Sequence, residues 1–175
     1  PQWAKKGMRG ESAKIKLVLK MIADVGLIGL PNAGKSTLIS TLTNARPKIA
    51  NYPFTTLEPN LGTFISDDKR FIVADIPGLI EGAHEGKGLG IKFLKHVERT
   101  KLLVHLIDAS SADPLADYRI VRTELGDFSK KLLKKKEIVV LSKIDLISED
   151  RVAEIVKLFK SNKIDPLVIS TVTND

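Results

Sequence analysis

One segment of the chain has residue types and spacing suited to phosphate binding. It matches the pattern G-x-x-x-x-G-K-[ST] and consists of Gly29, Leu30, Pro31, Asn32, Ala33, Gly34, Lys35 and Ser36. Glycines let backbone N–H groups approach phosphate oxygens, and the N-terminus of a following helix adds a positive dipole. We expect Lys35 to reach the β- and γ-phosphates and the Ser36 hydroxyl to bind Mg²⁺. The alternative is an ordinary strand–turn–helix connection that contains Gly-Lys-Ser by chance.

A second candidate for the same site is the tetrapeptide Asp75, Ile76, Pro77 and Gly78. A carboxylate at Asp75 can hold Mg²⁺, often through water, and the Gly78 N–H can face a γ-phosphate because glycine permits close approach. Most Asp-x-x-Gly sequences are simply turns. The position after an apolar segment and downstream of the phosphate loop favours the metal site.

Residues 51–59 lie between these two motifs, and Pro53 and Pro59 exclude a regular helix there. A threonine in such a loop can give its hydroxyl to Mg²⁺ and its N–H to the γ-phosphate. Loss of that phosphate would release the loop, which makes a switch. Residue chemistry does not choose between Thr55 and Thr56, and a plain surface loop is the alternative.

The tetrapeptide Ser142, Lys143, Ile144 and Asp145 could read a nucleotide base. The Asp145 carboxylate can accept two hydrogen bonds from guanine N1–H and N2–H₂, whereas adenine lacks that donor pair. A buried polar group left unpaired costs about 1–3 kcal/mol, so adenine would be disfavoured. Lys143 can lay its aliphatic stem over the base. The alternative is an aspartate that starts a helix on a surface loop.

Strand and helix patterns alternate along the chain and place these motifs at strand ends. Apolar or alternating segments predict strands at 15–21, 24–29, 61–65, 71–75, 102–108, 138–142 and 166–170. Helical spacing predicts helices at 35–43, 117–135 and 148–162, the last with Ser148 as N-cap. This alternation indicates an α/β fold with a mostly parallel sheet and helices on both faces. Ligands of such sheets bind at the carboxyl ends of the strands.

Composition narrows the class of protein further. The chain has 175 residues, a formal net charge of +7 and 43% hydrophobic residues, which fits one globular domain and excludes a disordered chain. It has no cysteine, which excludes disulfides and thiolate metal sites, and no apolar run near the roughly 20 residues that span a bilayer. The sequence begins at Pro1 rather than Met and suggests a piece of a longer protein.

Taken together, these residues resemble the GTPase domain of the Obg family of translational GTPases. The resemblance covers roughly residues 14–172. Its most specific marks are NYPFTTLEPNLG at 51–62 and DIPGLIEGAHEGKGLGIKFLKHVERT at 75–100. It implies a Ras-like P-loop NTPase fold whose sheet has one antiparallel edge strand. It also implies Mg²⁺-dependent GTP hydrolysis and a role in large ribosomal subunit assembly and stress signalling.

The resemblance also assigns residue roles. It implies that Thr56 is the Mg²⁺-binding threonine, beside Ser36 and Asp75. Lys35, Thr56, Gly78 and Asn32 become the expected catalytic set. The remaining nucleotide contacts are expected at Phe54, Thr55, Leu57, Glu58, Ser170, Thr171 and Val172, with backbone N–H groups of the last three facing guanine O6. We expect residues 1–21 to be the tail of a preceding glycine-rich domain or a linker, and residues 22–175 to be a GTPase domain that lacks its last helix.

Several positions depart from the family pattern or suggest slow catalysis. Ser142 stands where Asn is usual, so selectivity should survive on Asp145 with some affinity lost. Leu79 follows the Asp-x-x-Gly motif, where signalling GTPases have a Gln that orients water. Neither the phosphate loop nor the loop at 51–59 contains an Arg. Asn32 lies where related GTPases bind K⁺, although a turn-stabilising role is the alternative. His84 stands where Ser is more usual. We expect a solvated loop residue there, and the alternative is a histidine that positions water.

These features predict a slow GTPase switch that binds GTP and GDP. Two alternatives are a binding module for GDP or an alarmone nucleotide with negligible hydrolysis, and an ATPase on the same loop. The lysines at 130, 131, 134, 135 and 136 suit either a solvated helix end or contact with ribosomal RNA phosphates. We expect a cytoplasmic monomer without stable membrane insertion.

Overall fold

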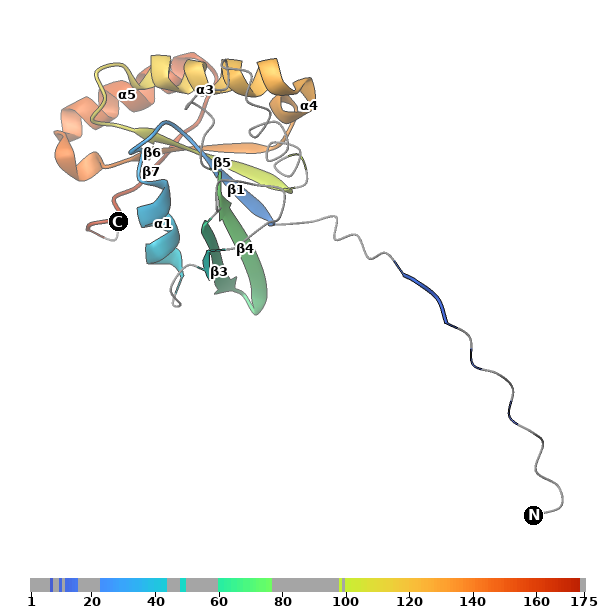
Figure 1. Cartoon of the computed structure of the whole chain (residues 1–175). Coiled ribbons are helices and arrows are strands. Elements are labelled where there is room, and N and C mark those ends of the chain that lie inside the picture. The colour runs from blue at the N-terminus through green and yellow to red at the C-terminus, as the bar shows by residue number, and fades with distance from the viewer. Residues whose placement is uncertain are drawn as a thin grey trace.

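A seven-stranded sheet forms the centre of the protein in the computed structural model, which describes residues 7, 10, 12–15, 23–43, 48–49, 60–76, 98 and 100–173 (Figure 1). The strand order is β2-β3-β4-β1-β5-β6-β7. The strands are β1 (Val25–Ile28), β2 (Lys48–Ile49), β3 (Asn60–Ser66), β4 (Lys69–Asp75), β5 (Leu102–Asp108), β6 (Glu137–Ser142) and β7 (Leu167–Val168). The helices are α1 (Lys35–Leu42), α3 (Pro114–Phe128), α4 (Lys130–Leu133), the short 3-10 helix η2 (Ile144–Leu146) and α5 (Glu149–Ser161).

The sheet is mostly parallel, as the alternation of strands and helices predicts. β1 pairs in parallel with β4 and β5, and β6 pairs in parallel with β5 and β7. β3 is the strand that runs in the opposite direction, antiparallel to both β4 and β2. The expected antiparallel edge strand therefore lies one position in from the edge, because the two-residue β2 pairs outside it.

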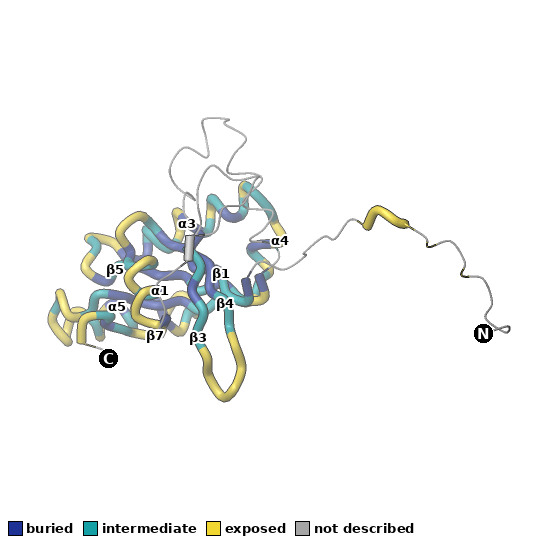
Figure 2. The backbone as a smooth tube through the Cα atoms, turned by 60° about the horizontal axis from the view of Figure 1, so that its bottom comes forward, coloured by how far each residue is buried: buried dark blue, intermediate teal, exposed yellow. Residues whose placement is uncertain are grey.

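Helices cover both faces of the sheet, so its central strands are buried on both sides (Figures 1 and 2). On one face Ile39 of α1 packs with Leu27 of β1 and Leu106 of β5. On the other face two clusters join β1, β5 and β6 to α3, α4 and α5. Neighbouring residues of β5 point to opposite faces, since successive strand side chains alternate. This explains why β5 is apolar at every position except His105 and Asp108.

The helix predicted at 117–135 is two helices rather than one. It begins earlier, at Pro114, because Asp113 caps it by accepting a hydrogen bond from the Ala116 N–H. It ends at Phe128, because Ser129 is extended (φ −158°, ψ 121°) and its hydroxyl accepts from Lys131 N and donates to Glu98 Oε1 at 2.6 Å. The serine thus ends one helix and caps the next, an effect that apolar spacing does not reveal.

The remaining sequence predictions agree with the structure except near the ends. Ser148 caps α5 as expected, by accepting from the Arg151 N–H. The last strand is shorter than predicted and covers only Leu167–Val168. Of the strand predicted at 15–21, Ile15 is 79% exposed and in no strand, and residues 16–21 lie outside the described residues. Within the described parts of the chain, no helix is long and apolar enough to cross a membrane.

Asp24, which precedes β1, connects β1 to β4 and β5 through hydrogen bonds and an ion pair. Its carboxylate accepts from the Ile72 N–H at 3.0 Å and forms an ion pair with Lys101 at 2.9 Å. Its backbone carbonyl accepts from the N–H groups of Lys101 and Leu102. The hydrogen bond from Ile72, together with the Lys101 ammonium, holds the pKa of Asp24 below its ordinary value.

We therefore expect Asp24→Ala to lower the free energy of unfolding by about 2 kcal/mol at pH 7, since hydrogen bonds to charged groups contribute about 1.5–3 kcal/mol. A depressed carboxyl pKa stabilises the fold above the unfolded value and is lost as pH falls through the folded value. The difference from wild type, measured by urea unfolding, should shrink below pH 4. Asp24→Asn, which keeps an acceptor for Ile72, should lose less. A pH-independent difference would contradict this account.

Candidate functional site

The polar residues singled out from the sequence meet at one edge of the sheet. The phosphate loop follows β1, Asp75 ends β4 and Asp108 ends β5. Ser142 ends β6, and residues 143–145 follow it. Because these strands are parallel, their carboxyl ends lie together, and the site occupies the edge where α/β sheets bind ligands.

The phosphate loop takes a backbone shape that its residue types permit. Gly29 has φ 148°, and a Cβ there would overlap the Leu106 carbonyl oxygen. Gly34, the residue before α1, has φ 92°. Asn32 is exposed and lies in the left-handed region at φ 63°, which asparagine tolerates better than most residues. The loop therefore curls over the N-terminus of α1, where backbone N–H groups lack helical partners.

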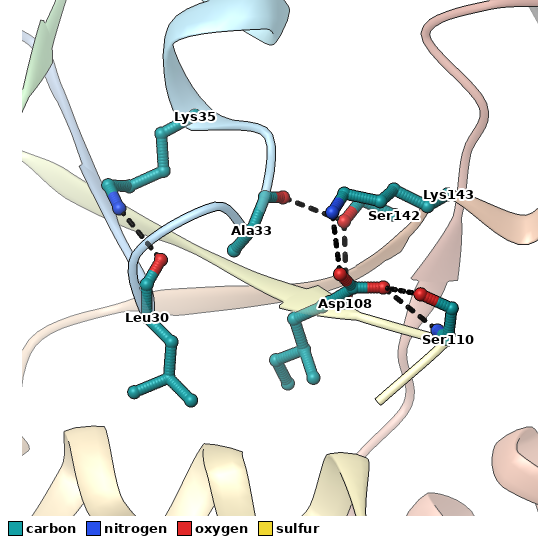
Figure 3. Close-up of polar contacts among 8 residues, drawn as sticks. Leu30, Ala33, Lys35, Asp108, Ser110, Ser142 and Lys143 are labelled. Atoms are coloured by element: carbon teal, nitrogen blue, oxygen red, sulfur yellow. Dashed lines mark hydrogen bonds and ion pairs between the residues drawn. The ribbon is translucent and has the colours of Figure 1, made fainter. Parts of the chain in front are cut away.

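Lys35 lies back across this loop. Its ammonium donates to the Leu30 carbonyl at 3.0 Å (Figure 3). It also donates to the Gly29 carbonyl at 3.1 Å. Burial lowers the pKa of Lys35, and the negative charge of Asp75 opposes that effect. The ammonium thus lies against the loop itself, and its expected contact with the β- and γ-phosphates stays a prediction.

Ser36 and Asp75 form the part of the site that could hold a metal ion. The Ser36 hydroxyl donates to Asp75 Oδ2 at 3.0 Å, although the two residues are 39 positions apart. Asp75 is 4% exposed, and its Oδ1 has no hydrogen-bond partner among the described residues. Burial raises the pKa of Asp75, against the Ser36 hydrogen bond and the Lys35 charge. A buried carboxylate oxygen without a partner beside a hydroxyl fits a hard cation such as Mg²⁺.

Ser142 connects residues 142–145, the candidate base-reading segment, to the phosphate loop. Its hydroxyl, buried at 2% exposure, lies 2.8 Å from the Ala33 carbonyl oxygen and 3.1 Å from that of Ile107 (Figure 3). A serine has one hydroxyl proton, so it satisfies these acceptors by turns or by sharing. Despite its short side chain, Ser142 therefore contacts the phosphate loop directly.

Asp145 is oriented by Ser170, which follows the last strand. The Ser170 hydroxyl donates to Asp145 Oδ1 at 2.6 Å and accepts from the N–H groups of Val172 and Thr173. Ser170 is buried whereas Asp145 is exposed. The carboxylate is therefore fixed on its protein side and accessible to a ligand from solvent. The sequence predicted only a backbone role for Ser170. Its hydroxyl, which follows the strand parallel to β6, could have indicated the side-chain contact with Asp145.

Other members of the expected contact set take mixed positions. Ile76 is buried and its N–H donates to the Leu27 carbonyl, whereas Ile144 packs against the α5 cluster and Val172 is 76% exposed. Several predicted residues lie outside the described residues, and their roles stay predictions: Phe54, Thr55, Thr56, Leu57, Glu58, Pro77, Gly78, Leu79 and His84.

Asp108 is a polar residue of this edge that sequence analysis did not single out. It ends β5, and its carboxylate forms a 2.6 Å ion pair with the Lys143 ammonium. The rule that located the other residues, a polar side chain directly after a buried parallel strand, also applies to this position.

Fold and site together define a P-loop nucleotide-binding domain, and comparison with known proteins identifies its family. The family model described as "50S ribosome-binding GTPase" matches residues 24–143. The chain therefore belongs to the 50S ribosome-binding GTPase family.

Within that family the chain is similar to curated proteins named GTPase Obg. It is 61% identical to the one from Pelagibacter ubique over 93% of this chain and 50% of the relative. It is 55% identical to the one from Finegoldia magna over 100% of this chain and 42% of the relative. The resemblance stated from the motifs is confirmed, and the chain spans about half the length of the curated relatives it matches.

Solved structures of related GTPases share the fold. A variant of Aquifex aeolicus Era bound to GDP·AlF4⁻ superposes with a TM-score of 0.63 and 25% identity, over 87% of this chain and 52% of that one. The cytosolic domain of the T. maritima FeoB iron transporter in its GMPPNP form gives 0.60 and 26%, over 88% and 59%. The Ras-like P-loop fold expected from the resemblance is confirmed.

Proposed function

We propose that this chain is the GTPase domain of an Obg-type protein and that it hydrolyses GTP to GDP and phosphate with Mg²⁺. The proposal rests on one observation: the phosphate loop and the base-reading segment lie side by side and are joined by a hydrogen bond. The Ser142 hydroxyl joins the phosphate loop to the base-reading segment, and Ser170 orients the Asp145 carboxylate beside it. An oriented carboxylate at this place suits the N1–H and N2–H₂ donors of guanine.

Each residue of the proposed site has a distinct task. Backbone N–H groups at the start of α1 would bind phosphate oxygens, and the Lys35 ammonium would leave the loop carbonyls to neutralise charge on the β- and γ-phosphates. Ser36 and Asp75 would hold Mg²⁺, which supplies further charge neutralisation when bound. By resemblance, Thr56 and the Gly78 N–H would complete the metal and γ-phosphate contacts.

We further propose that intrinsic turnover is slow. Leu79 cannot orient water as a glutamine would, and the two nucleotide loops contain no arginine. Two sources could supply the missing positive charge. One is K⁺ near Asn32, whose left-handed backbone also suits a plain turn residue. The other is a ribosomal particle that acts as the activator.

Turnover measured in KCl and in NaCl at equal ionic strength distinguishes these sources. If K⁺ supplies the charge, kcat should be at least about tenfold higher in KCl, because one correctly placed charge lowers a barrier by more than about 1.4 kcal/mol. Asn32→Ala should reduce that ratio toward one. Equal rates in both salts would exclude K⁺ and leave the ribosomal particle as the activator.

The proposed partner is the large ribosomal subunit, and the surface that suits RNA is the lysine-rich segment 130–136, which comprises α4 and the residues that follow it. Four lysines of this segment are exposed: Lys130, Lys131, Lys134 and Lys136. Lys135, which the sequence grouped with them, instead turns inward and donates to the backbone carbonyls of Glu98 and Thr100. Burial lowers its pKa, although the charge of Glu98 opposes the shift. The proposed RNA contact therefore rests on four lysines rather than five.

Charge reversal tests this surface. We expect the triple variant with Lys130, Lys131 and Lys134 changed to Glu to bind the large subunit more weakly. The slope of log K against log salt should become shallower by about 3, one unit for each RNA phosphate that these lysines no longer neutralise. Binding is measured by co-sedimentation across a salt series. A control with the exposed lysines 69, 157 and 163 reversed has the same net charge. If both variants bind alike, segment 130–136 is not the RNA contact.

Other proposals complete the functional assignment. We propose residues 1–21 as a linker or the tail of a glycine-rich domain and residues 22–175 as the GTPase domain. We also propose a monomer that acts in the cytoplasm in ribosome assembly and stress signalling. The competing assignment, a guanine-nucleotide binding module, differs in one result. A single-turnover assay with Mg²⁺ and K⁺ should yield GDP within hours for the GTPase and none for the binding module.

A further inference from the structure

The ammonium of Lys143 is fixed in place by Asp108 from the neighbouring strand. Lys143 Nζ lies 2.6 Å from Asp108 Oδ2, and the two side chains are only 30% and 23% exposed (Figure 3). The β5–β6 register places Asp108 opposite Ser142, so the carboxylate lies directly beside the base-reading segment. A partly buried pair at this distance is a charge-assisted hydrogen bond, which is stronger than an exposed ion pair.

Asp108 is itself held so that one oxygen faces the lysine. Its other oxygen, Oδ1, accepts from the Ser110 N–H at 2.9 Å and the Ser110 hydroxyl at 2.5 Å. Burial alone would raise the pKa of Asp108, but the hydrogen bonds from Lys143 and Ser110 outweigh it and keep the pKa below its ordinary value. The carboxylate is therefore charged at neutral pH and has little freedom to turn away.

The backbone of Lys143 adds a second constraint. Lys143 lies in the left-handed region, with φ 58° and ψ 35°, which is uncommon for a residue with a Cβ. Ser142 on one side is buried against the phosphate loop, and η2 begins on the other. With its backbone set and its ammonium fixed, the four-carbon stem of Lys143 is held at both ends.

We propose that Asp108 is a positioning residue that holds the Lys143 stem in the place where it covers the guanine ring. The inference rests on the proposed function, since it requires a nucleotide base beside Asp145. Without Asp108, a free lysine would lose rotamer freedom each time a nucleotide binds. With Asp108 present, that ordering is complete before binding, which favours association.

The expected effect follows from what the stem contacts. The stem covers the face of the base rather than its edge, so Asp108→Asn should weaken GTP, GDP and IDP by the same factor, about 3- to 10-fold. KM for GTP should rise with the Kd, while kcat at saturation changes less than twofold. The introduced amide oxygen can still accept from Ser110, which turns the amide NH₂ group, a donor, toward Lys143. The variant therefore removes the acceptor that fixes the ammonium and leaves the Ser110 contact in place.

A double-mutant cycle tests whether Asp108 acts through Lys143. Lys143→Met keeps an apolar side chain and removes the ammonium. We would measure Kd for a fluorescent GDP analogue, with unlabelled GDP and IDP as competitors, in wild type, both single variants and the double variant. Thermal unfolding of all four checks their folding. In the Lys143→Met background, Asp108→Asn should have no further effect.

Three results would overturn the proposal: equal losses from Asp108→Asn in both backgrounds, no loss in wild type, or a kcat that falls as much as the affinity. If Asp108→Asn unfolds the chain, Lys143→Met alone remains decisive, because unchanged GDP affinity in that variant excludes an anchored stem. Failure of the proposed function looks different, since wild type itself would then bind neither GDP nor IDP.

Discussion

Asp145→Asn is expected to weaken GTP binding by about 100-fold and to strengthen binding of xanthosine triphosphate. The carboxylate accepts two hydrogen bonds from guanine, whereas an amide would direct one donor at the guanine N2 amino group, which is itself a donor. Xanthine carries a carbonyl at that position and would accept from the amide. Loss of a bidentate pair with an unmatched donor costs about 1–3 kcal/mol, which corresponds to roughly 5- to 160-fold.

Competition between the two nucleotides for one fluorescent probe measures this inversion. Asp165→Asn serves as a control, because that carboxylate is 86% exposed and pairs with Lys160 at the end of α5. Ser170→Ala should weaken GTP binding by a smaller factor and should not favour xanthosine triphosphate, since it frees the Asp145 carboxylate without introducing a donor. An Asp145→Asn variant that keeps its preference for GTP would show that the base is recognised elsewhere.

Lys35→Met is expected to reduce kcat for GTP by about 10²- to 10³-fold, the usual loss when one group that stabilises developing charge is removed. The melting temperature should change little. Burial already disfavours the charged ammonium, and its present partners are the backbone carbonyls of Gly29 and Leu30 rather than a charged group. Single-turnover hydrolysis and thermal unfolding measure the two effects separately.

A matched variant makes the Lys35 result specific. Lys101→Met also removes an ammonium, but one that pairs with Asp24 at the opposite end of β1. It should lower stability slightly and leave turnover unchanged. If Lys35→Met retains wild-type turnover, the phosphate loop does not act on GTP as proposed.

Buried elements were predictable from the sequence where both faces of a strand are covered. The strand at 102–108 has the bounds predicted from its apolar run, and the strand at 138–142 extends by one residue to Glu137. The predicted bounds of the helix at 117–135 were wrong at both ends. Aspartate and serine side chains cap backbone groups there, which apolar spacing does not detect.

Candidate site residues could be predicted where they belong to a motif of fixed spacing. Side chains that contact a site residue from a distant part of the sequence could not. Motif spacing alone nominates the phosphate loop and Asp145, and their roles toward a nucleotide stay predictions. The contacts from Ser142 to the phosphate loop, from Ser170 to Asp145 and from Asp108 to Lys143 join residues that are 109, 25 and 35 positions apart. Only the parallel register of the sheet brings such pairs together.

The most direct test of the central claim is one competition experiment on wild type. GTP, GDP and ATP compete for a fluorescent guanine nucleotide with Mg²⁺ and K⁺ present, and bound GTP is then followed in a single turnover. The account predicts that GTP and GDP bind at least about 100-fold more tightly than ATP, and that bound GTP becomes GDP within hours. Equal affinity for ATP, or GTP that stays intact, would contradict it.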